Sequence, residues 1–503
     1  MRRAFLNRHR ELHTLEEAIR SPRAEMVILY GRRGVGKSAL MQHALEQTGR
    51  RYIYYRATRR TLPLQIAAMR DAVAQVYPEA YVPAVFTSTE DFLAYLAHLA
   101  SGQSEPLLFV IDELPYLVEA DPSLLSVLQH WWDTHKSVPQ IKVFLLGSTL
   151  AFMERQVLDA GAPLYHRRTR SLRLEPMDYA EAALFFPMYS PQQKMEAYAI
   201  LGGMPLYLEQ FDPEQDIEQN VISTVLQRHT FLSEEPEWLL LEEFRRDLLY
   251  SSILRAVAAG HRRPSDIANA IGKGSAQDIA VALDKLQQLG LIVREVPVTE
   301  RSLPRSRRSL YYLADEYLHF WYRFVDPYSS MVARGLGRQV WEQHIAPLLS
   351  HFVSRPAFER ACRQYVWRVV EAGKWSLPLV AIGAWWGAGG REIDVVAVDE
   401  QYRLVLAGSC KWTSDPVDIA DYVALQRNVQ LAQEELRPRE KPTFALFSRT
   451  GFTPRLQQLA QAEGERLLLV DLKQMYEVNN SHTSSSSDET WLPGQDSNLR
   501  PSG

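Results

Sequence analysis

Short apolar runs alternate with longer stretches of helical spacing over residues 1–178. The apolar runs cover residues 26–30, 51–55, 107–111 and 143–146, and each is followed by a stretch in which apolar positions recur on one helix face. An alternation of strands and helices is typical of a parallel sheet that helices cover on both faces. We therefore expect an α/β domain over residues 1–178.

The pattern changes twice further along the chain. Residues 179–227 have helical spacing, interrupted at Gly202-Gly203-Met204-Pro205, which predicts a helical subdomain at 179–245. Helical stretches at 253–259, 264–270 and 279–289 are followed by short strands at 291–293 and 310–313. This order predicts a winged helix at 246–330.

The last part of the chain has a third pattern. A helix is expected at 358–370, followed by strands at 380–384, 393–398, 404–407 and 444–447, which predicts an α/β domain at 331–478. Residues 479–503 are polar and rich in serine. We expect them to be disordered and assign them no function.

A glycine-rich loop joins the strand at 26–30 to the helix that begins near Lys37. Residues 31–38 read Gly-Arg-Arg-Gly-Val-Gly-Lys-Ser, the spacing of a phosphate-binding loop. Glycines let backbone N–H groups approach phosphate oxygens, and the following helix adds its positive end. We expect Lys37 to reach the β- and γ-phosphates and Ser38 to bind Mg²⁺. The predicted nucleotide contacts in this segment are Gly31, Gly34, Val35, Gly36, Lys37, Ser38 and Ala39.

Two acidic residues follow the apolar strand at 107–111. Asp112 is expected to hold Mg²⁺, directly or through water, and Glu113 to orient or deprotonate the attacking water. Further along, Arg167 or Arg168 could contact the γ-phosphate, either in the same chain or from a neighbouring subunit. A solvated basic loop is the alternative interpretation of these two arginines.

Several short motifs together resemble one known family. They are Phe5-Leu6-Asn7-Arg8 with Glu11, the loop at 31–38, the Ile111-Asp112-Glu113 strand end, Gly147-Ser148, and Gly202-Gly203-Met204-Pro205. The combination resembles the prokaryotic "archaeal ATPase" family, within the STAND branch of the AAA+ NTPases. The resemblance implies ATP rather than GTP, with Asn7 and Arg8 lining the adenine and Pro205 near the nucleotide. It also implies that Ser148 is a sensor of the γ-phosphate or of the attacking water.

The winged-helix segment is locally basic, although the chain has a net charge of −4. Residues 251–310 hold ten Lys and Arg against five Asp and Glu, concentrated at His261-Arg262-Arg263 and at 301–308. A basic wing beside a helix-turn-helix indicates contact with the phosphates of double-stranded DNA. Packing on the ATPase domain, or contact with a protein, is the alternative.

The C-terminal segment resembles the restriction-endonuclease-like, or PD-(D/E)XK, domains. The resemblance implies a Mg²⁺-dependent nuclease site made of Glu359, Asp394 and Lys411. Ser409 stands where the family pattern has an acid, and a hydroxyl is a weaker Mg²⁺ ligand than a carboxylate. A working nuclease and a non-cleaving relative both remain open.

These features predict an ATPase that uses ATP and Mg²⁺ to switch the arrangement of its C-terminal modules, with slow hydrolysis and association with DNA. The alternatives are a STAND-type signalling scaffold that binds proteins or its own copies, and an active ATP-dependent nuclease. Two cysteines, no apolar segment at the N-terminus and no apolar run long enough to span a bilayer lead us to expect a cytoplasmic protein without a membrane partner.

Overall fold

The first sheet is parallel throughout and has the strand order β2-β3-β4-β1-β5. The computed structural model describes residues 5–244, 247–301, 306, 308–387 and 390–477. The strands are β1 (Glu25–Tyr30), β2 (Tyr52–Arg56), β3 (Leu107–Asp112), β4 (Ile141–Gly147) and β5 (Arg170–Arg173). The first four were expected, whereas β5 was not. Its Arg-Ser-Leu-Arg sequence lies at the sheet edge and has no apolar run.

Helices cover both faces of this sheet, which confirms the expected α/β architecture. On one face, α1 (His9–Arg20) and α2 (Lys37–Thr48) join an apolar cluster with Val27, Leu29 and Val110. The other face carries Met26, Ile28 and Phe109. That face is covered by α3 (Leu62–Val76), α4 (Thr89–Ser101), α5 (Leu114–Ala120) and α6 (Leu124–His135). Neighbouring residues of a strand point to opposite faces, so an unbroken apolar run fills both cores.

A group of helices follows the sheet. After α7 (Leu150–Phe152) and the π-helix η1 (Met153–Leu158) come α8 (Tyr179–Ala182), η2 (Ala183–Phe185), α9 (Pro191–Leu201), α10 (Pro205–Leu208), α11 (Ile217–Thr224) and α12 (Phe231–Phe244). Helix α9 stops before Gly202, which has a φ of +67°, and α10 begins with Pro205. The break therefore falls where the sequence predicts it, because glycine permits the left-handed turn and proline starts a new helix.

The next elements have the order expected of a winged helix. They are α13 (Leu248–Ala258), α14 (Pro264–Ala270), η3 (Ala276–Ile279), α15 (Ala280–Gln288) and the antiparallel pair β6 (Ile292–Glu295) and β7 (Leu310–Leu313). We refer to residues 248–313 as the winged-helix segment. The expected basic wing is partly described, because residues 302–305 and 307 lie outside the described residues.

The described wing arginines contact the C-terminal part of the chain. Arg308 pairs with Glu435 at 2.7 Å, and Arg301 donates to the carbonyl of Gln401 at 2.9 Å. The Arg308 carbonyl also accepts a hydrogen bond from the Trp386 indole at 3.0 Å. In this arrangement both arginines are engaged within the chain, Arg308 in an ion pair and Arg301 in a hydrogen bond to a carbonyl.

A second helical run leads to the last sheet. It comprises α16 (Glu316–Phe320), η5 (Trp321–Val325), η6 (Asp326–Tyr328), α17 (Ser329–Ala333), α18 (Gly337–Val340), η7 (Trp341–Ile345), α19 (Ala346–Phe352), η8 (Val353–Phe358) and α20 (Glu359–Glu371). Helix α9 packs against α16 and η8, and α24 also contacts it. One continuous apolar cluster therefore joins a face of the first sheet to the winged-helix segment and to α20.

The last sheet is mixed and has the strand order β12-β11-β10-β9-β8. Its strands are β8 (Ala381–Trp386), β9 (Glu392–Val398), β10 (Leu404–Lys411), β11 (Thr443–Ser448) and β12 (Leu467–Asp471), and its further helices are α21 (Ile419–Leu431), α22 (Gln433–Leu436), α23 (Pro454–Glu463), η10 (Gly464–Arg466) and α24 (Leu472–Glu477). The pairs β8–β9 and β9–β10 are antiparallel, whereas β10–β11 and β11–β12 are parallel. The predicted tail at 479–503 lies outside the described residues.

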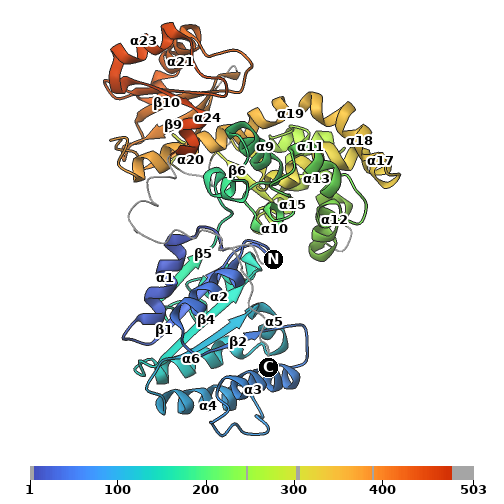
Figure 1. The fold of residues 1–503 in the computed structure, drawn as a ribbon, viewed down its shortest axis with the longest axis vertical. Coiled ribbons are helices and arrows are strands. Elements are labelled where there is room, and N and C mark those ends of the chain that lie inside the picture. Colours follow the sequence, from blue (N-terminus) through green and yellow to red (C-terminus); the bar gives the residue numbers. More distant parts are fainter. Residues whose placement is uncertain (1–4, 245–246, 302–305, 307, 388–389, 478–503) are drawn as a thin grey trace, which may run out of the picture.

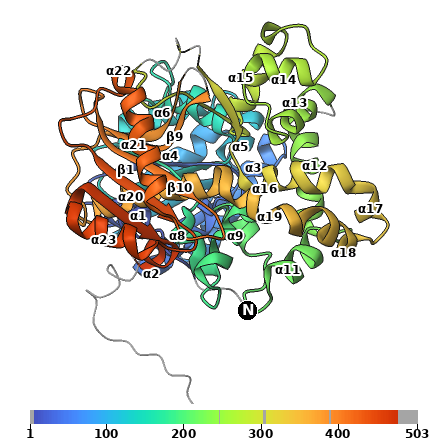
Figure 2. The ribbon, with the colours of Figure 1, turned by 90° about the horizontal axis from the view of Figure 1, so that it is seen from above.

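Figure 1 shows the first sheet at one end of the molecule, the last sheet at the other, and the helices α9–α19 between and beside them. Seen from above, the last sheet with α21 and α23 and the helices α14 and α15 occupy opposite sides (Figure 2). No helix in the described part of the chain is apolar over a length that would cross a bilayer. The predicted domain boundaries near 178, 245, 330 and 478 stay predictions.

Candidate functional site

The phosphate loop follows β1 and is shaped by close backbone approaches. Gly34 and Gly36 have φ angles of +82° and +98°, which residues with side chains rarely adopt. A Cβ added at Gly31 would lie 2.4 Å from the carbonyl oxygen of Leu174, and one at Gly34 would lie 2.7 Å from the side chain of Leu206. Glycine is therefore needed for the loop to wrap tightly between β5 and α10.

The Gly202–Pro205 segment, which separates α9 from α10, lies against this loop. The Leu206 amide donates to the Gly34 carbonyl at 3.4 Å, and Pro205 Cγ would be 3.9 Å from a Cβ added at Gly36. The backbone of Gly203 is bonded to Met177, whose amide donates to the Gly203 carbonyl at 2.8 Å. The structure thus brings the sequence-predicted Pro205 next to the phosphate loop.

Lys37 is buried beneath the loop. Its ammonium donates to the carbonyls of Gly31 at 2.9 Å and Arg32 at 3.0 Å. Burial lowers the pKa of Lys37, and the charges of Glu113 and Asp112 oppose that shift. An arriving phosphate would offer this ammonium a stronger, charge-assisted acceptor than the neutral carbonyls.

Asp112 ends β3 and lies beside Ser38, the first residue after Lys37 in α2. Its Oδ2 accepts hydrogen bonds from Ser38 Oγ and from Tyr54 OH, both at 2.8 Å, with Arg56 Nε at 3.5 Å. Among the described residues its other oxygen, Oδ1, is buried and has no hydrogen-bond partner. A buried carboxylate oxygen without a partner is costly unless a ligand completes it.

This pair of oxygen ligands fits Mg²⁺. The ion prefers hard oxygen ligands and is usually held by one or two protein groups together with water and substrate phosphates. The Ser38 hydroxyl and the free Oδ1 of Asp112 supply that set, so these residues would hold the ion. When bound, Mg²⁺ would neutralise charge on the β- and γ-phosphates.

Glu113 lies next to Asp112 and is held by Ser148. Ser148 Oγ, after β4, donates to Glu113 Oε2 at 2.6 Å. The Glu113 backbone has a φ of +59°, a left-handed conformation that a non-glycine residue rarely adopts. Strain of this kind, retained next to the phosphate loop, is typical of a site where a side chain must point in one direction. The structure brings both predicted residues together.

Asn7 and Arg8 precede α1 and are anchored near the loop. Both have positive φ angles, +60° and +64°. Arg8 is buried and donates to the carbonyls of Glu175 at 2.7 Å and Val35 at 3.4 Å. Asn7 Nδ2 donates to Glu181 Oε1 at 2.6 Å. Arg8 therefore supports the loop from below, and its predicted contact with adenine stays a prediction.

Arg167 and Arg168 are held by nearby groups. Arg167 pairs with Asp133 at 2.9 Å. Arg168 donates to the Tyr165 carbonyl at 2.7 Å and lies 4.6 Å from the centre of that ring. A contact of either arginine with a γ-phosphate requires these interactions to be exchanged, so that role stays a prediction.

Residues that the sequence does not single out complete the site. Tyr54 and Arg56 reach Asp112 from β2, because β2 pairs with β3 and Arg56 lies opposite Asp112. Arg32, inside the loop, donates to Asp315 Oδ2 at 3.0 Å, and the Asp315 side chain is only 1% exposed. Tyr54 and Arg56 are two residues apart in the strand Tyr-Ile-Tyr-Tyr-Arg, so their side chains point to the same face, and this spacing could have indicated that both lie at the site. No local signal, by contrast, pairs Arg32 with Asp315.

The acidic residues of the predicted nuclease site lie around a guanidinium. Arg355 Nε lies 2.6 Å from Glu359 Oε1, and its terminal nitrogens lie 3.1 Å from Glu392 and 3.7 Å from Asp394. Burial and the charge of Asp394 raise the pKa of Glu359 to about 7. Arg355 thus contacts the carboxylates that a metal ion would need.

The other two residues of this group are also engaged. Ser409 Oγ donates to Asp394 Oδ2 at 3.3 Å, and Lys411 pairs with Asp421 at 3.2 Å. Within the ranges that the structure describes, no group of three or more His, Cys, Asp or Glu is arranged to hold a metal ion. The geometry brings Glu359 and Asp394 together, with Lys411 turned to another acid.

Two family models match the chain. Residues 5–211 match an ATPase domain predominantly from Archaea, and residues 321–424 match archaeal and bacterial proteins of unknown function. An uncharacterized protein of Methanocaldococcus jannaschii is 28% identical over 416 residues, which cover 81% of this chain and 87% of that protein.

Solved structures resemble the chain more distantly. A Walker-type ATPase of Pyrococcus abyssi has 21% identity and a TM-score of 0.49, and the match covers 64% of this chain and 97% of that one. The ORC2 protein of Aeropyrum pernix, in its ADPNP and ADP complexes, has 13% identity and a TM-score of 0.42, with 67% and 97% covered. At these scores neither likeness carries a conclusion about function. Residues 5–211 are thus similar to an ATPase domain found predominantly in Archaea, and residues 321–424 are similar to archaeal and bacterial proteins of unknown function.

Proposed function

We propose that the chain is a Mg²⁺-dependent switch that binds and slowly hydrolyses ATP, and whose phosphate loop controls the position of α16, the helix that follows the winged-helix segment. The observation that carries this proposal is the ion pair of Arg32 with Asp315. Arg32 belongs to the phosphate loop, and Asp315 caps α16 by accepting from the Tyr317 amide at 2.8 Å. A change in the loop would therefore act directly on the start of α16.

Lys37 provides the link between phosphate and Arg32. Its ammonium bonds to the carbonyl of Arg32, the residue whose side chain holds Asp315. If Lys37 turned toward a γ-phosphate, that carbonyl would lose a hydrogen bond and the loop would adjust at Arg32. ATP would then favour one arrangement of the loop and ADP another, which is how nucleotide switches operate.

A second ion pair extends the path toward the last domain. Glu316, next to Asp315, pairs with Arg360 on α20, and Arg360 follows Glu359 of the carboxylate group. The Glu316 side chain is almost fully buried, and Arg360 is its neighbouring cation. Because separating a buried ion pair leaves an uncompensated buried charge, movement of α16 would act on α20 through this pair.

Removal of Mg²⁺ tests the proposal. The full chain is expected to bind and turn over ATP in Mg²⁺, and to lose turnover when EDTA removes the ion, because Ser38 and Asp112 would then lack the cation that would neutralise charge on the phosphates. Nucleotide binding and phosphate release are measured with and without Mg²⁺. The Lys37→Ala variant should neither bind nor hydrolyse ATP, with or without Mg²⁺. The control is Lys136→Ala, which changes an exposed lysine. Equal turnover by Lys37→Ala and wild type would refute the assignment.

Association with DNA is a second candidate, favoured by exposed cations around the helix-turn-helix. Arg263 and Lys273 are exposed at the ends of α14, whereas Arg301 and Arg308 are engaged within the chain. The cations Arg263 and Lys273 can contact phosphates, and their effect must weaken with salt.

Binding of double-stranded DNA at two salt concentrations tests this candidate. The expected result is binding at low salt that weakens steeply at higher salt, and a smaller salt slope for Arg263→Gln, by about one unit. Absence of binding at low salt removes the DNA role. An ATP-dependent change in oligomeric state without DNA affinity would instead favour the protein-binding scaffold.

A further inference from the structure

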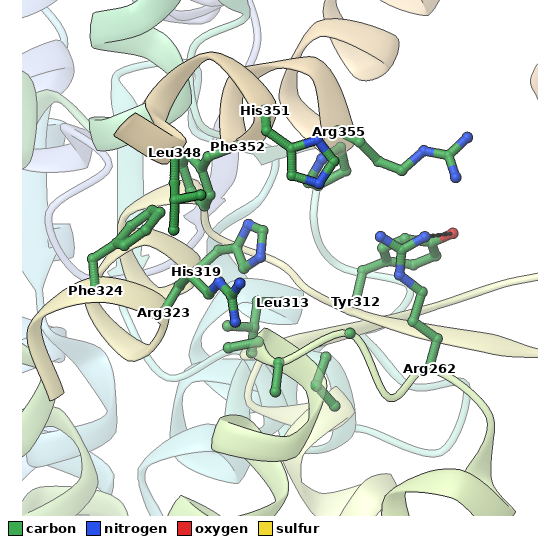
Figure 3. A pocket seen from close by; sticks show the side chains of 15 residues that line it. Arg262, Tyr312, Leu313, His319, Arg323, Phe324, Leu348, His351, Phe352 and Arg355 are labelled. Atoms are coloured by element: carbon green, nitrogen blue, oxygen red, sulfur yellow. Dashed lines mark hydrogen bonds between the residues drawn. The ribbon is translucent and has the colours of Figure 1, made fainter. Parts of the chain in front are cut away.

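A cavity of about 180 Å³ lies where the winged-helix segment meets α16 and α19. Its walls come from the end of α13, from β7, from α16 with η5, and from α19 with η8 (Figure 3). This volume is large enough for several water molecules. It is smaller than the roughly 300 Å³ at which sites for drug-sized ligands begin. The cavity therefore fits a small group better than a whole nucleotide.

The charged side chains at the cavity wall all have one sign. The lining residues with polar side chains are Arg262, Tyr312, His319, Arg323, His351 and Arg355. Among the lining residues, all of which lie in the described part of the chain, there is no Asp or Glu. Figure 3 shows these side chains gathered around one space from separate elements. A concave surface with cations and no carboxylate attracts an anion.

Two of these arginines have only weak partners. Arg262 lies 4.6 Å from the centre of the Tyr312 ring and donates to its hydroxyl at 3.4 Å. The Arg323 guanidinium lies 6.0 Å from the centre of the Phe324 ring, and its side chain is exposed. Over the described ranges, neither arginine is paired with a carboxylate. Both guanidinium groups are therefore available to an incoming ligand.

Arg355 differs from these two. Its guanidinium pairs with Glu359 and Glu392, which do not line the cavity. We therefore do not count Arg355 among the groups that would bind a ligand. His351 is exposed at the mouth, on the side of α19.

His319 lies in the cavity wall. Burial, together with the charges of Arg262 and Arg360, lowers the pKa of His319 to about 3, so the ring is neutral near pH 7. The smaller part of this shift, which comes from the two arginines, disfavours a further cation at this place and favours an anion.

We propose that this cavity is a binding site for a phosphate group, held by the guanidinium groups of Arg262 and Arg323 with the His351 ring at its mouth. Guanidinium groups match phosphate oxygens because their N–H groups form a planar fork that can donate two hydrogen bonds at once. The phosphate can belong to inorganic phosphate or a small phosphate ester, or to the end of a nucleic-acid strand. All share the same chemistry, and the cavity volume accepts one such group.

Calorimetric titration of the full chain with inorganic phosphate tests the site. The ionic strength is kept constant, and a non-hydrolysable ATP analogue with Mg²⁺ fills the phosphate loop. The wild type is expected to bind phosphate, and Arg262→Gln and Arg323→Gln to bind it at least tenfold more weakly, since a hydrogen bond to a charged group is lost. The control is Arg334→Gln, an exposed arginine after α17 that does not line the cavity and should bind like the wild type.

Arg323 is exposed, so its variant is expected to keep the fold even if Arg262→Gln does not. No phosphate binding by the wild type, or equal binding by Arg323→Gln, overturns the proposal. Loss of binding in Lys37→Ala with Arg323→Gln unchanged also overturns it, because the signal then belongs to the phosphate loop.

A 5′-phosphorylated oligonucleotide that binds more tightly than its unphosphorylated form, with the difference lost in Arg323→Gln, identifies a nucleic-acid end as the source. Equal binding of the two oligonucleotides, beside arginine-dependent binding of phosphate, identifies a small phosphate ligand.

Discussion

The Glu113→Gln variant is expected to hydrolyse ATP about 10²–10⁴-fold more slowly than the wild type while still binding Mg²⁺-ATP. Glu113 is held by Ser148 at 2.6 Å in a strained backbone conformation beside Asp112, which suits a group that must orient or accept a proton from water. Glutamine keeps the size of the side chain and its bond to Ser148 but cannot accept the proton. Single-turnover hydrolysis and nucleotide affinity are measured side by side.

Two further variants serve as comparisons for Glu113→Gln. Glu119→Gln, at the other end of α5, changes an exposed acid that is 3.7 Å from Arg59 and should leave the rate unchanged. Lys37→Ala should lose affinity as well as rate, because its ammonium serves phosphate binding in both the ground state and the transition state. If Glu113→Gln and Glu119→Gln hydrolyse ATP equally fast, Glu113 does not act on the water.

The Arg32→Ala variant is expected to lower the free energy of unfolding by about 3–5 kcal/mol. Asp315 is 1% exposed in its side chain, and without Arg32 its charge would remain buried next to the phosphate loop. The change is measured as the shift of the urea transition of the full chain. Addition of ATP should also no longer alter protease protection near α16 in this variant, because the loop has lost its contact with Asp315.

A double-mutant cycle separates the interaction energy of Arg32 with Asp315 from the other effects of each substitution. Arg32→Ala with Asp315→Asn should cost less than the sum of the two single variants, since the second change removes the uncompensated charge. The control is Arg338→Ala, which breaks a pair with Glu218 in which both side chains are largely exposed, and which should cost no more than about 1 kcal/mol. Additive single effects would mean that Arg32 and Asp315 are not coupled.

The sequence by itself determined the elements that depend on short-range patterns. Strands β1, β3 and β4 each contain a continuous apolar run of at least four residues, and the loop that follows β1 has a spacing that only a tight, glycine-rich turn satisfies. Residues such as Lys37, Ser38, Asp112 and Glu113 sit at fixed offsets from those elements, so a pattern within a few residues was enough to place them. The polar edge strand β5 was missed because it has no such pattern.

Only the tertiary structure decided which distant groups meet. Arg32 and Asp315 are 283 residues apart, and nothing in the spacing around either residue indicates the other. The same holds for Arg355 with Glu392 and Asp394, and for Arg301 and Arg308 of the wing, which contact the last domain. The physical reason is that a local pattern indicates only which face of a helix or strand is buried. The partner of a charged side chain depends instead on how the elements pack, and this packing is decided by contacts throughout the core.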